Sequence, residues 1–268
     1  IRLTPFFSCG AKAPIWALLA TVVAGQFLSD IFVYSIYILG IAVAIIVALI
    51  IKAFSKNYEV PPFIMELPAY HMPRLIDVLR SMWERGWSFI KKAGTIIVLS
   101  TIFVWFTSYF GFVDGHFQML SEDQIDSSIL ASIGNLIAWI FIPLGWGNWQ
   151  AAVASITGLV AKENIVATMS ILYGGGELST YATLATHFTA ITGYSFLVFN
   201  LLCAPCFAAI GAIKREMNNP KLTWFAILYQ CGFAYVIAFL VTQIGNAFVE
   251  SINILGIIIS VAILACMI

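Results

Sequence analysis

Apolar residues run through this chain in long stretches that are separated by short polar segments. A helix that crosses a membrane needs about 20 consecutive apolar residues. Uninterrupted stretches of about that length occupy residues 32–51, 93–112, 222–248 and 252–268. The pattern predicts a spanning helix at each of them.

Other apolar stretches are interrupted by polar residues, glycine or proline. They are residues 1–25, broken at 8–14; residues 188–212, broken at Cys203-Ala204-Pro205-Cys206; and residues 149–172, broken by Gly158 and by Lys162-Glu163. A helix break inside a membrane is costly because lipid offers no partner to the freed backbone groups. We therefore expect these breaks to have a function.

Residues 129–144 form a shorter apolar stretch that ends in the turn-rich segment 143–148. As a helix it would be roughly 24 Å long, at about 1.5 Å per residue. It therefore either re-enters the membrane or spans a thinned region. Together the patterns predict an all-α fold, a polytopic transmembrane helical bundle with broken or re-entrant helices.

Charged residues are divided unequally between the loops. Residues 52–92 contain seven lysines and arginines, whereas residues 112–128 contain four acidic residues and no lysine or arginine. Because basic loops stay on the inner side of a membrane, the first loop is predicted to be cytoplasmic and the second external. Residues 214–221 are basic and mark another cytoplasmic loop. The apolar stretches alternate consistently between the two sides if residues 129–144 are counted as a crossing.

Prolines at 61, 62, 68 and 73 punctuate the amphipathic segment 58–89. This composition favours an interfacial element on the cytoplasmic side of the membrane. An ordinary solvated loop is the alternative interpretation.

Composition supports a lipid environment for most of the surface. The chain has 268 residues, of which 61% are hydrophobic and 10% are charged, whereas a soluble domain has about 25% charged residues. A formal net charge of +0 gives no global attraction for nucleic acid. The five cysteines are an odd number, which disfavours a disulfide framework.

Cys9 and Cys206 each lie at a proline-containing break, in segments predicted to run in opposite directions. Opposed broken helices place unwound backbone and helix ends together near the middle of the membrane, as a transporter site requires. We therefore consider both cysteines candidate metal ligands that approach each other there. The alternative is that both are small packing residues.

Cys203 and Cys206 form a C-x-x-C pair. The sequence has no second such pair and no histidine at ligand spacing, so a closed structural zinc site is not predicted. Cys203 is either a supporting residue of the candidate site or faces lipid. Cys231 and Cys266 have no motif around them and are interpreted as packing residues.

Lys162 and Glu163 lie near the middle of an apolar stretch, where ionisable residues are costly and usually functional. Glu163 is a candidate cation ligand, with Lys162 balancing its charge. An internal ion pair that only stabilises packing is the alternative. Lys12 lies in the first break and either lines a cavity or extends its amine to the membrane surface.

The sequence contains no G-x-x-x-x-G-K-[ST] and no G-x-G-x-x-G motif. We therefore predict that this chain by itself does not bind and hydrolyse a nucleotide, and that it is not an enzyme.

Four segments resemble signature blocks of the ferrous iron transport protein B family, and they occur in the family's order. They are P-F-F-S-C-G-A-K-A-P at 5–14, E-L-P-A-Y-H-M-P at 66–73, N-W-Q-A with G-L-V-A-K-E at 148–163, and P-C with A-I-K-R-E at 205–216. The blocks cover residues 1 to about 217. Ser8 and Glu66 lie in them and join Cys203, Lys12 and Lys162 as supporting residues for the candidate ligands.

The resemblance implies a division of the chain into four parts. They are the family's core membrane segment at 1–57, a cytoplasmic amphipathic segment at 58–89, a gate-type repeat similar to nucleoside transporters at 90–217, and C-terminal transmembrane helices at 218–268. Family members also carry an amino-terminal GTP-binding domain and a first gate segment, and we expect this chain to be a fragment without them.

The resemblance implies that the chain is a membrane permease domain for Fe²⁺ in a bacterial inner membrane. It also implies gating by GTP and Mg²⁺ in the missing domain, a small cytoplasmic accessory protein, and a homo-oligomer as a possible assembly. Fe²⁺ accepts sulfur as well as oxygen ligands, which suits cysteine and glutamate at helix breaks. The alternatives are a nucleoside or small-solute carrier of similar gate fold, and a non-transporting assembly or sensor protein.

Overall fold

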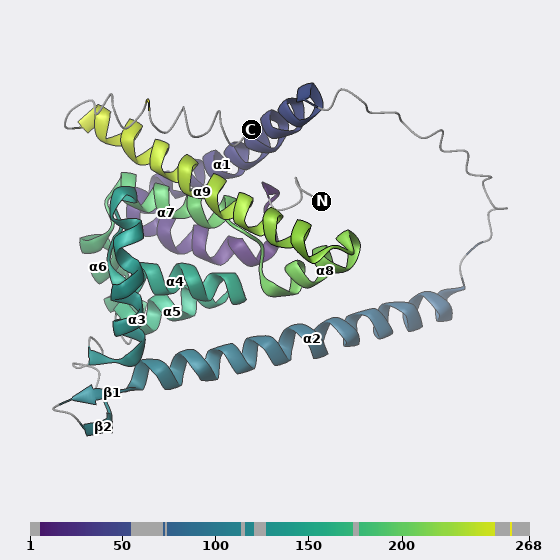
Figure 1. Ribbon diagram of the computed structural model, residues 1–268, viewed down its shortest axis with the longest axis horizontal. Helices are drawn as coiled ribbons and strands as arrows, with labels where there is room; N and C mark the ends of the chain where they lie inside the picture. The colour runs from purple at the N-terminus through teal and green to yellow at the C-terminus, as the bar shows by residue number, and fades with distance from the viewer. Residues whose placement is uncertain are drawn as a thin grey trace.

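The computed structural model describes residues 6–54, 72, 74–113, 116–120, 127–173, 177–249 and 258. Nearly all of the described chain is helical (Figure 1). The elements in order are η2 (Gly10–Lys12), α1 (Ala13–Phe54), α2 (Leu75–Tyr109), β1 (Phe110–Val113), β2 (His116–Met119), α3 (Ile129–Ala138), η4 (Trp139–Leu144), α4 (Trp149–Val160), α5 (Asn164–Tyr173), α6 (Glu177–His187), α7 (Ala190–Leu202), α8 (Phe207–Met217) and α9 (Pro220–Val249). The all-α prediction is confirmed.

Helix α1 is bent at Gly25, whose φ of 68° and ψ of 170° lie outside the helical region. A side chain would disfavour this left-handed backbone, which glycine adopts at no steric cost. The part after the bend includes Leu28–Ile50, a stretch of 23 residues that is long and apolar enough to cross a membrane. The predicted span at residues 32–51 is therefore a helix in the structure.

Helix α9 is the second described helix of sufficient length and apolarity, over Pro220–Asn246. It packs along α7 at the centre of the bundle. Thr242 of α9 donates a 2.9 Å hydrogen bond to the Ser195 hydroxyl of α7 and lies 3.0 Å from the carbonyl oxygen of Leu144. These polar contacts join α9 to both α7 and the turn after η4. They also satisfy polar groups for which lipid would offer no hydrogen-bond partner.

Residues 149–172 do not form one interrupted crossing, because α5 folds back on α4. The hydroxyl groups of Thr157 and Thr168 lie 3.2 Å apart, whereas 11 residues of straight helix would separate them by roughly 16 Å. The turn between the helices is the predicted break at Lys162 and Glu163. The break is therefore confirmed. The membrane crossing that the loop charges implied for residues 149–172 is wrong, because α5 packs along α4 and returns the chain to the side from which it came.

The stretch at residues 129–144 lies across the bundle. Together α3 and η4 make an angle of 97° with α4, and α6 makes an angle of 100° with α7. The sequence analysis counted residues 129–144 and 149–172 as one crossing each. Removing both leaves the predicted sides of all other segments unchanged, because two crossings return the chain to the side from which it started. Accordingly, the end of α1, the start of α2 and the turn between α8 and α9 lie at one end of the bundle, and the β hairpin lies at the other (Figure 1).

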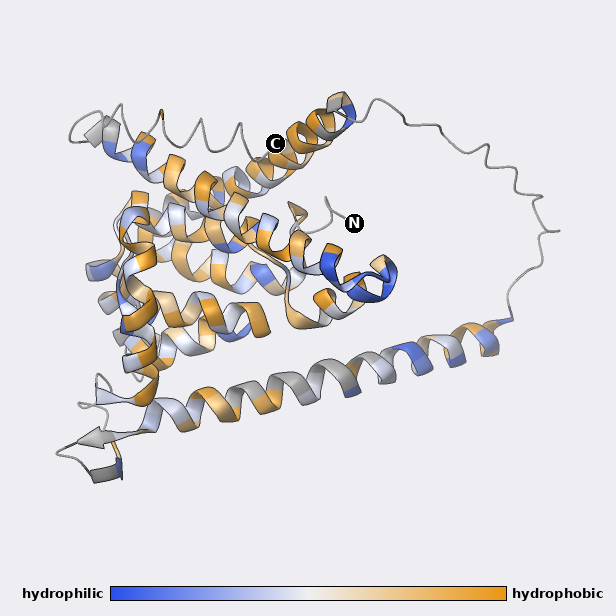
Figure 2. Cartoon of the chain, viewed as in Figure 1, coloured by the Kyte–Doolittle hydropathy of each residue, from blue (hydrophilic) through white to orange (hydrophobic). Residues whose placement is uncertain are grey.

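Helix α2 runs along one side of the bundle and continues into the predicted span at 93–112, ending at Tyr109 (Figure 1). The β1–β2 hairpin follows it, with Phe110 paired to Met119, and was not predicted. The start of α2 mixes charged and apolar positions (Figure 2) and is exposed. Interfacial placement of residues 58–89 stays a prediction, and most of that segment lies outside the described residues.

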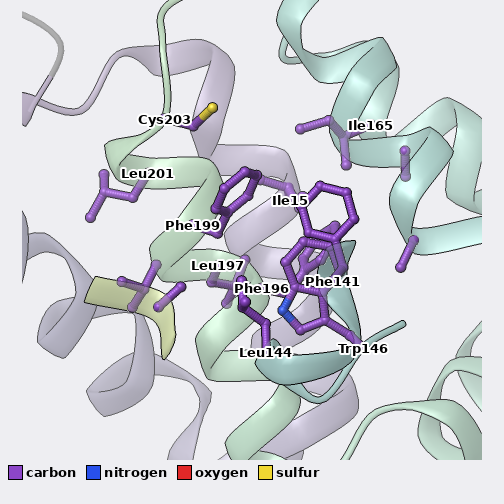
Figure 3. Close-up of a cluster of buried hydrophobic side chains, with 14 of the residues drawn as sticks. Ile15, Phe141, Leu144, Trp146, Ile165, Phe196, Leu197, Phe199, Leu201 and Cys203 are labelled. Carbon is purple, nitrogen blue, oxygen red and sulfur yellow. The ribbon is translucent and has the colours of Figure 1, made fainter. Parts of the chain in front are cut away.

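Aromatic side chains fill the core between the turn after η4 and α7 (Figure 3). The Trp146 ring stacks on Phe141 at 4.4 Å between centroids and meets the edge of Phe196 at 5.0 Å. Their burial removes a large apolar area from the surroundings and fixes the sharp turn before α4. Glu66, Cys266 and almost all of the predicted span at 252–268 lie outside the described residues.

Candidate functional site

Three breaks that are far apart in the sequence meet at one place, which we call the break junction: residues 9–12, 161–163 and 200–206. The ammonium group of Lys12 donates a 2.7 Å hydrogen bond to the carbonyl oxygen of Leu201. The ammonium group of Lys162 donates a 3.3 Å hydrogen bond to the carbonyl oxygen of Asn200. Two lysines from separate segments thus bind consecutive carbonyls at the end of α7.

The end of α7 has a physical need for such donors. The last carbonyl groups of a helix lack partners within the helix, and the chain after Cys203 reaches Pro205, which has no N–H to donate. Positive charge is also favourable at this end because the helix dipole is negative there. The sequence therefore combines a helix stop with two side chains that satisfy it.

Both lysines are buried, with exposed fractions of 4% for Lys12 and 2% for Lys162. Within the described ranges the structure contains one ion pair, between Arg80 and Glu84 on the exposed face of α2. Glu163 is exposed and does not pair with its neighbour. The alternative of an internal Lys162–Glu163 ion pair is therefore not what the structure shows.

Three cysteines lie in the segments that the two lysine hydrogen bonds bring together. Cys9, Cys203 and Cys206 lie within electrostatic range of both Lys12 and Lys162. Cys9 is exposed and precedes η2, Cys203 is buried at the end of α7, and Cys206 is half-buried at the start of α8. The two predicted candidates, Cys9 and Cys206, thus belong to the same junction, as does the supporting residue Cys203.

Cys231 of α9 also belongs to the junction. Its sulfur lies 3.6 Å from that of Cys203 and within electrostatic range of Lys162. Sequence reasoning interpreted Cys231 as a packing residue because no motif surrounds it. Only the packing of α9 against the end of α7 brings it to this position.

Asn200 is a further polar group at the junction that sequence reasoning missed. Its side-chain amide donates a 2.9 Å hydrogen bond to the carbonyl oxygen of Phe196, whereas its buried Oδ1 has no hydrogen-bond partner in the described structure. An unpartnered buried acceptor calls for an explanation, such as a cation or a water molecule. The sequence did offer one sign of it, because Asn200 is a single amide within the apolar stretch that forms α7.

Ser8 lines a small cavity beside the junction. The cavity has a volume of about 60 Å³ and lies between the segment before η2 and α1, with Leu201 at one wall. A volume of this size is sufficient for water. Glu66, the other supporting residue taken from the resemblance, lies outside the described residues.

The described residues do not include three histidine, cysteine, aspartate or glutamate side chains grouped closely enough to hold one metal ion. Cys9, Cys206 and Glu163 are therefore not assembled into one cage in this conformation.

Comparisons with known proteins identify two regions of the chain. A family model described as "Ferrous iron transport protein B C terminus" matches residues 33–85, and a model described as "Nucleoside recognition" matches residues 90–220. No solved structure matches the chain.

Curated relatives match over most of the chain. A protein named "Fe(2+) transporter FeoB" from Methanocaldococcus jannaschii is 36% identical over 92% of this chain and 37% of its own length. Proteins of the same name from Staphylococcus aureus and Salmonella paratyphi A are 36% and 31% identical, over 93% and 91% of this chain. The chain spans 36–38% of the length of these three relatives.

Proposed function

Because the chain belongs to the ferrous iron transport protein B family and matches its C-terminal membrane region, we propose that it forms the path by which Fe²⁺ crosses a bacterial inner membrane. The match is to the transport part of these proteins, so the chain is not an enzyme in its own right.

The break junction is the observation that carries this proposal. Two of the three breaks supply donor atoms: residues 9–12 supply the sulfur of Cys9, and residues 200–206 supply the sulfurs of Cys203 and Cys206 and the unpartnered amide oxygen of Asn200. Fe²⁺ accepts sulfur, nitrogen and oxygen ligands, whereas Mg²⁺ and Ca²⁺ favour oxygen alone. A mixed set of donors at unwound backbone therefore suits Fe²⁺ better than those ions.

The ion is proposed to move between successive weak sites and not through one cage. Glu163 is exposed and supplies a carboxylate where an ion approaches the turn between α4 and α5. Asn200 supplies a donor at the end of α7, Cys206 supplies one at the start of α8, and Cys9 supplies the next one beside η2. Lys12 and Lys162 keep the end of α7 in place while they remain bonded to its carbonyls.

The driving force and the sidedness are further parts of the proposal. The resemblance to the family implies a GTP-binding domain with Mg²⁺ that gates the path and a small cytoplasmic accessory protein. The basic end of the bundle, at the end of α1 and the start of α2, is placed in the cytoplasm because it carries the lysine and arginine excess.

Anaerobic uptake of radioactive Fe²⁺ by cells that express the full-length protein tests the proposal. Cys206→Ser keeps the size of the side chain and replaces sulfur by oxygen, so it should reduce uptake several-fold with unchanged expression. The matched control is Ser132→Cys on the exposed face of α3, which should have no effect. Equal uptake by Cys206→Ser and the unmodified protein would contradict a ligand role, and absent uptake by the unmodified protein would contradict iron transport.

Transport of a nucleoside is the second candidate, because residues 90–220 match a model described as "Nucleoside recognition". A nucleoside site needs polar side chains that bind a base and a ribose, whereas the break junction offers mainly cysteine and lysine. Thermal unfolding in detergent under anaerobic conditions separates the two functions. Stabilisation by Fe²⁺ and not by nucleosides is expected, and the reverse result would favour the second candidate.

A further inference from the structure

The sulfur atoms of Cys203 and Cys231 face each other at 3.6 Å, although 28 positions separate them in the sequence. Cys203 ends α7 and is buried, and Cys231 lies on α9 and is half-buried. The backbone N–H of Cys203 donates a 2.8 Å hydrogen bond to the carbonyl oxygen of Phe199. One thiol therefore lies on the last turn of a broken helix and the other on a continuous helix beside it.

The structure distinguishes this pair from the pair that the sequence suggests. Cys203 and Cys206 form the C-x-x-C motif, but Cys203 ends α7 whereas Cys206 begins α8. Across the ranges that the structure describes, the thiol that Cys203 contacts is that of Cys231 and not that of Cys206.

The surroundings of the pair favour reaction. The two sulfurs are already near enough to react with each other, because they lie 3.6 Å apart. Cys231 is the more accessible of the two, and oxidants attack accessible thiolates first. A second thiol in van der Waals contact can then complete a disulfide by a small rotation of the side chains.

We propose that Cys203 and Cys231 are a redox-active dithiol that closes to a disulfide between the end of α7 and α9. A peroxide is the oxidant. The Cys231 thiolate attacks one peroxide oxygen, the O–O bond breaks, and a sulfenic acid and hydroxide form. The hydroxide takes up the proton that the Cys231 thiol released on ionising and becomes the first water. The Cys203 sulfur then attacks the sulfenic sulfur, the S–O bond breaks, and the leaving hydroxide takes the Cys203 proton to form the second water.

The disulfide would fix the α7 end of the break junction to α9, the long helix that packs along α7. Asn200, Leu201 and Cys206 lie close to Cys203 in the sequence. The disulfide would therefore reduce the freedom of their carbonyl and thiol groups to rearrange around a passing ion. This consequence rests on the proposed transport of Fe²⁺, whereas formation of the disulfide does not.

Bond formation is tested by mass spectrometry on the full-length protein in native membranes. Membranes are treated with hydrogen peroxide, the peroxide is removed with catalase, free thiols are blocked with N-ethylmaleimide, and unreduced protein is digested. A cross-linked peptide that joins Cys203 to Cys231 and disappears in Cys231→Ser is expected. A Cys203–Cys206 link in its place, or alkylation of both Cys203 and Cys231 after oxidation, would overturn the proposal.

The same preparations test the consequence for transport. Peroxide treatment should lower Fe²⁺ uptake several-fold in the unmodified protein, dithiothreitol should restore it, and Cys231→Ser should be insensitive to peroxide. Loss of uptake to the same extent in Cys231→Ser would contradict control by this pair. Absence of uptake before oxidation would count against the proposed function alone, because the cross-link is measured independently.

Discussion

The ammonium group of Lys12 binds the carbonyl oxygen of Leu201 at 2.7 Å, across 189 positions of the sequence. This hydrogen bond joins the first break of the chain to the last described one. With the parallel bond from Lys162 to Asn200, it makes the end of α7 the point on which three separate segments converge. The stability of that point can be tested apart from transport.

Lys12→Met should lower the free energy of unfolding by about 1–2 kcal/mol. A hydrogen bond from a buried charge is worth about 1.5–3 kcal/mol, and removing the buried charge recovers part of that loss. Thermal unfolding of the purified protein in detergent measures the change. Lys214→Met on the exposed face of α8 is the matched control and should unfold at the original temperature. Equal unfolding temperatures for both variants would show that the Lys12 bond does not hold α7.

Gly158→Ala should destabilise the hairpin of α4 and α5. A β-carbon at this position would lie 2.5 Å from Cγ1 of Ile165, which is fully buried and has little room to move. Overpacking of this kind costs about 1–3 kcal/mol. Unfolding in detergent should therefore occur at a lower temperature.

Gly211→Ala provides the control for that experiment, because no atom lies within 4 Å of a β-carbon there. It should be neutral or stabilise α8 by up to about 1 kcal/mol, since alanine favours a helix more than glycine does. Combining Gly158→Ala with Ile165→Val should recover part of the loss. A Gly158→Ala protein as stable as Gly211→Ala would contradict the close approach of α4 to α5.

Glu163→Gln should leave the unfolding temperature unchanged and remove most Fe²⁺ uptake by the full-length protein. The side chain is exposed, so neutralising it disturbs no packing, whereas a carboxylate at a turn within an apolar stretch is expected to serve the ion path. Glu216→Gln on the exposed face of α8 is a control for general effects of lost charge. Normal uptake by well-expressed Glu163→Gln would remove Glu163 from the path.

Single cysteines at Ser81 and Ser121, in a protein without other reactive thiols, test the sidedness. A membrane-impermeant maleimide should label the Ser121 site in intact cells and the Ser81 site only after the membrane is opened. Residues 52–92 carry an excess of lysine and arginine, whereas residues 112–128 contain neither. Basic loops stay on the inner side of a membrane. Labelling of the Ser81 site alone in intact cells would invert the orientation.

The sequence by itself determined the main apolar helices and two of the breaks between helices. Continuous apolar runs predicted the helices that include residues 32–51 and 222–248, and proline, glycine or charge marked the breaks at Lys162-Glu163 and at 203–206. These properties are local, because a run of apolar side chains and a missing backbone donor act within a few residues of themselves. The motifs at the breaks also identified the family.

Only the tertiary structure decided which breaks meet and how the chain passes between them. The return of α5 along α4, the two lysines on the carbonyls of Asn200 and Leu201, and the contact of Cys231 with Cys203 each depend on helix packing. Hydropathy does not specify that packing, because every face of a helix in lipid can be apolar, and close approach then depends on small residues such as Gly158 and on polar contacts between distant segments.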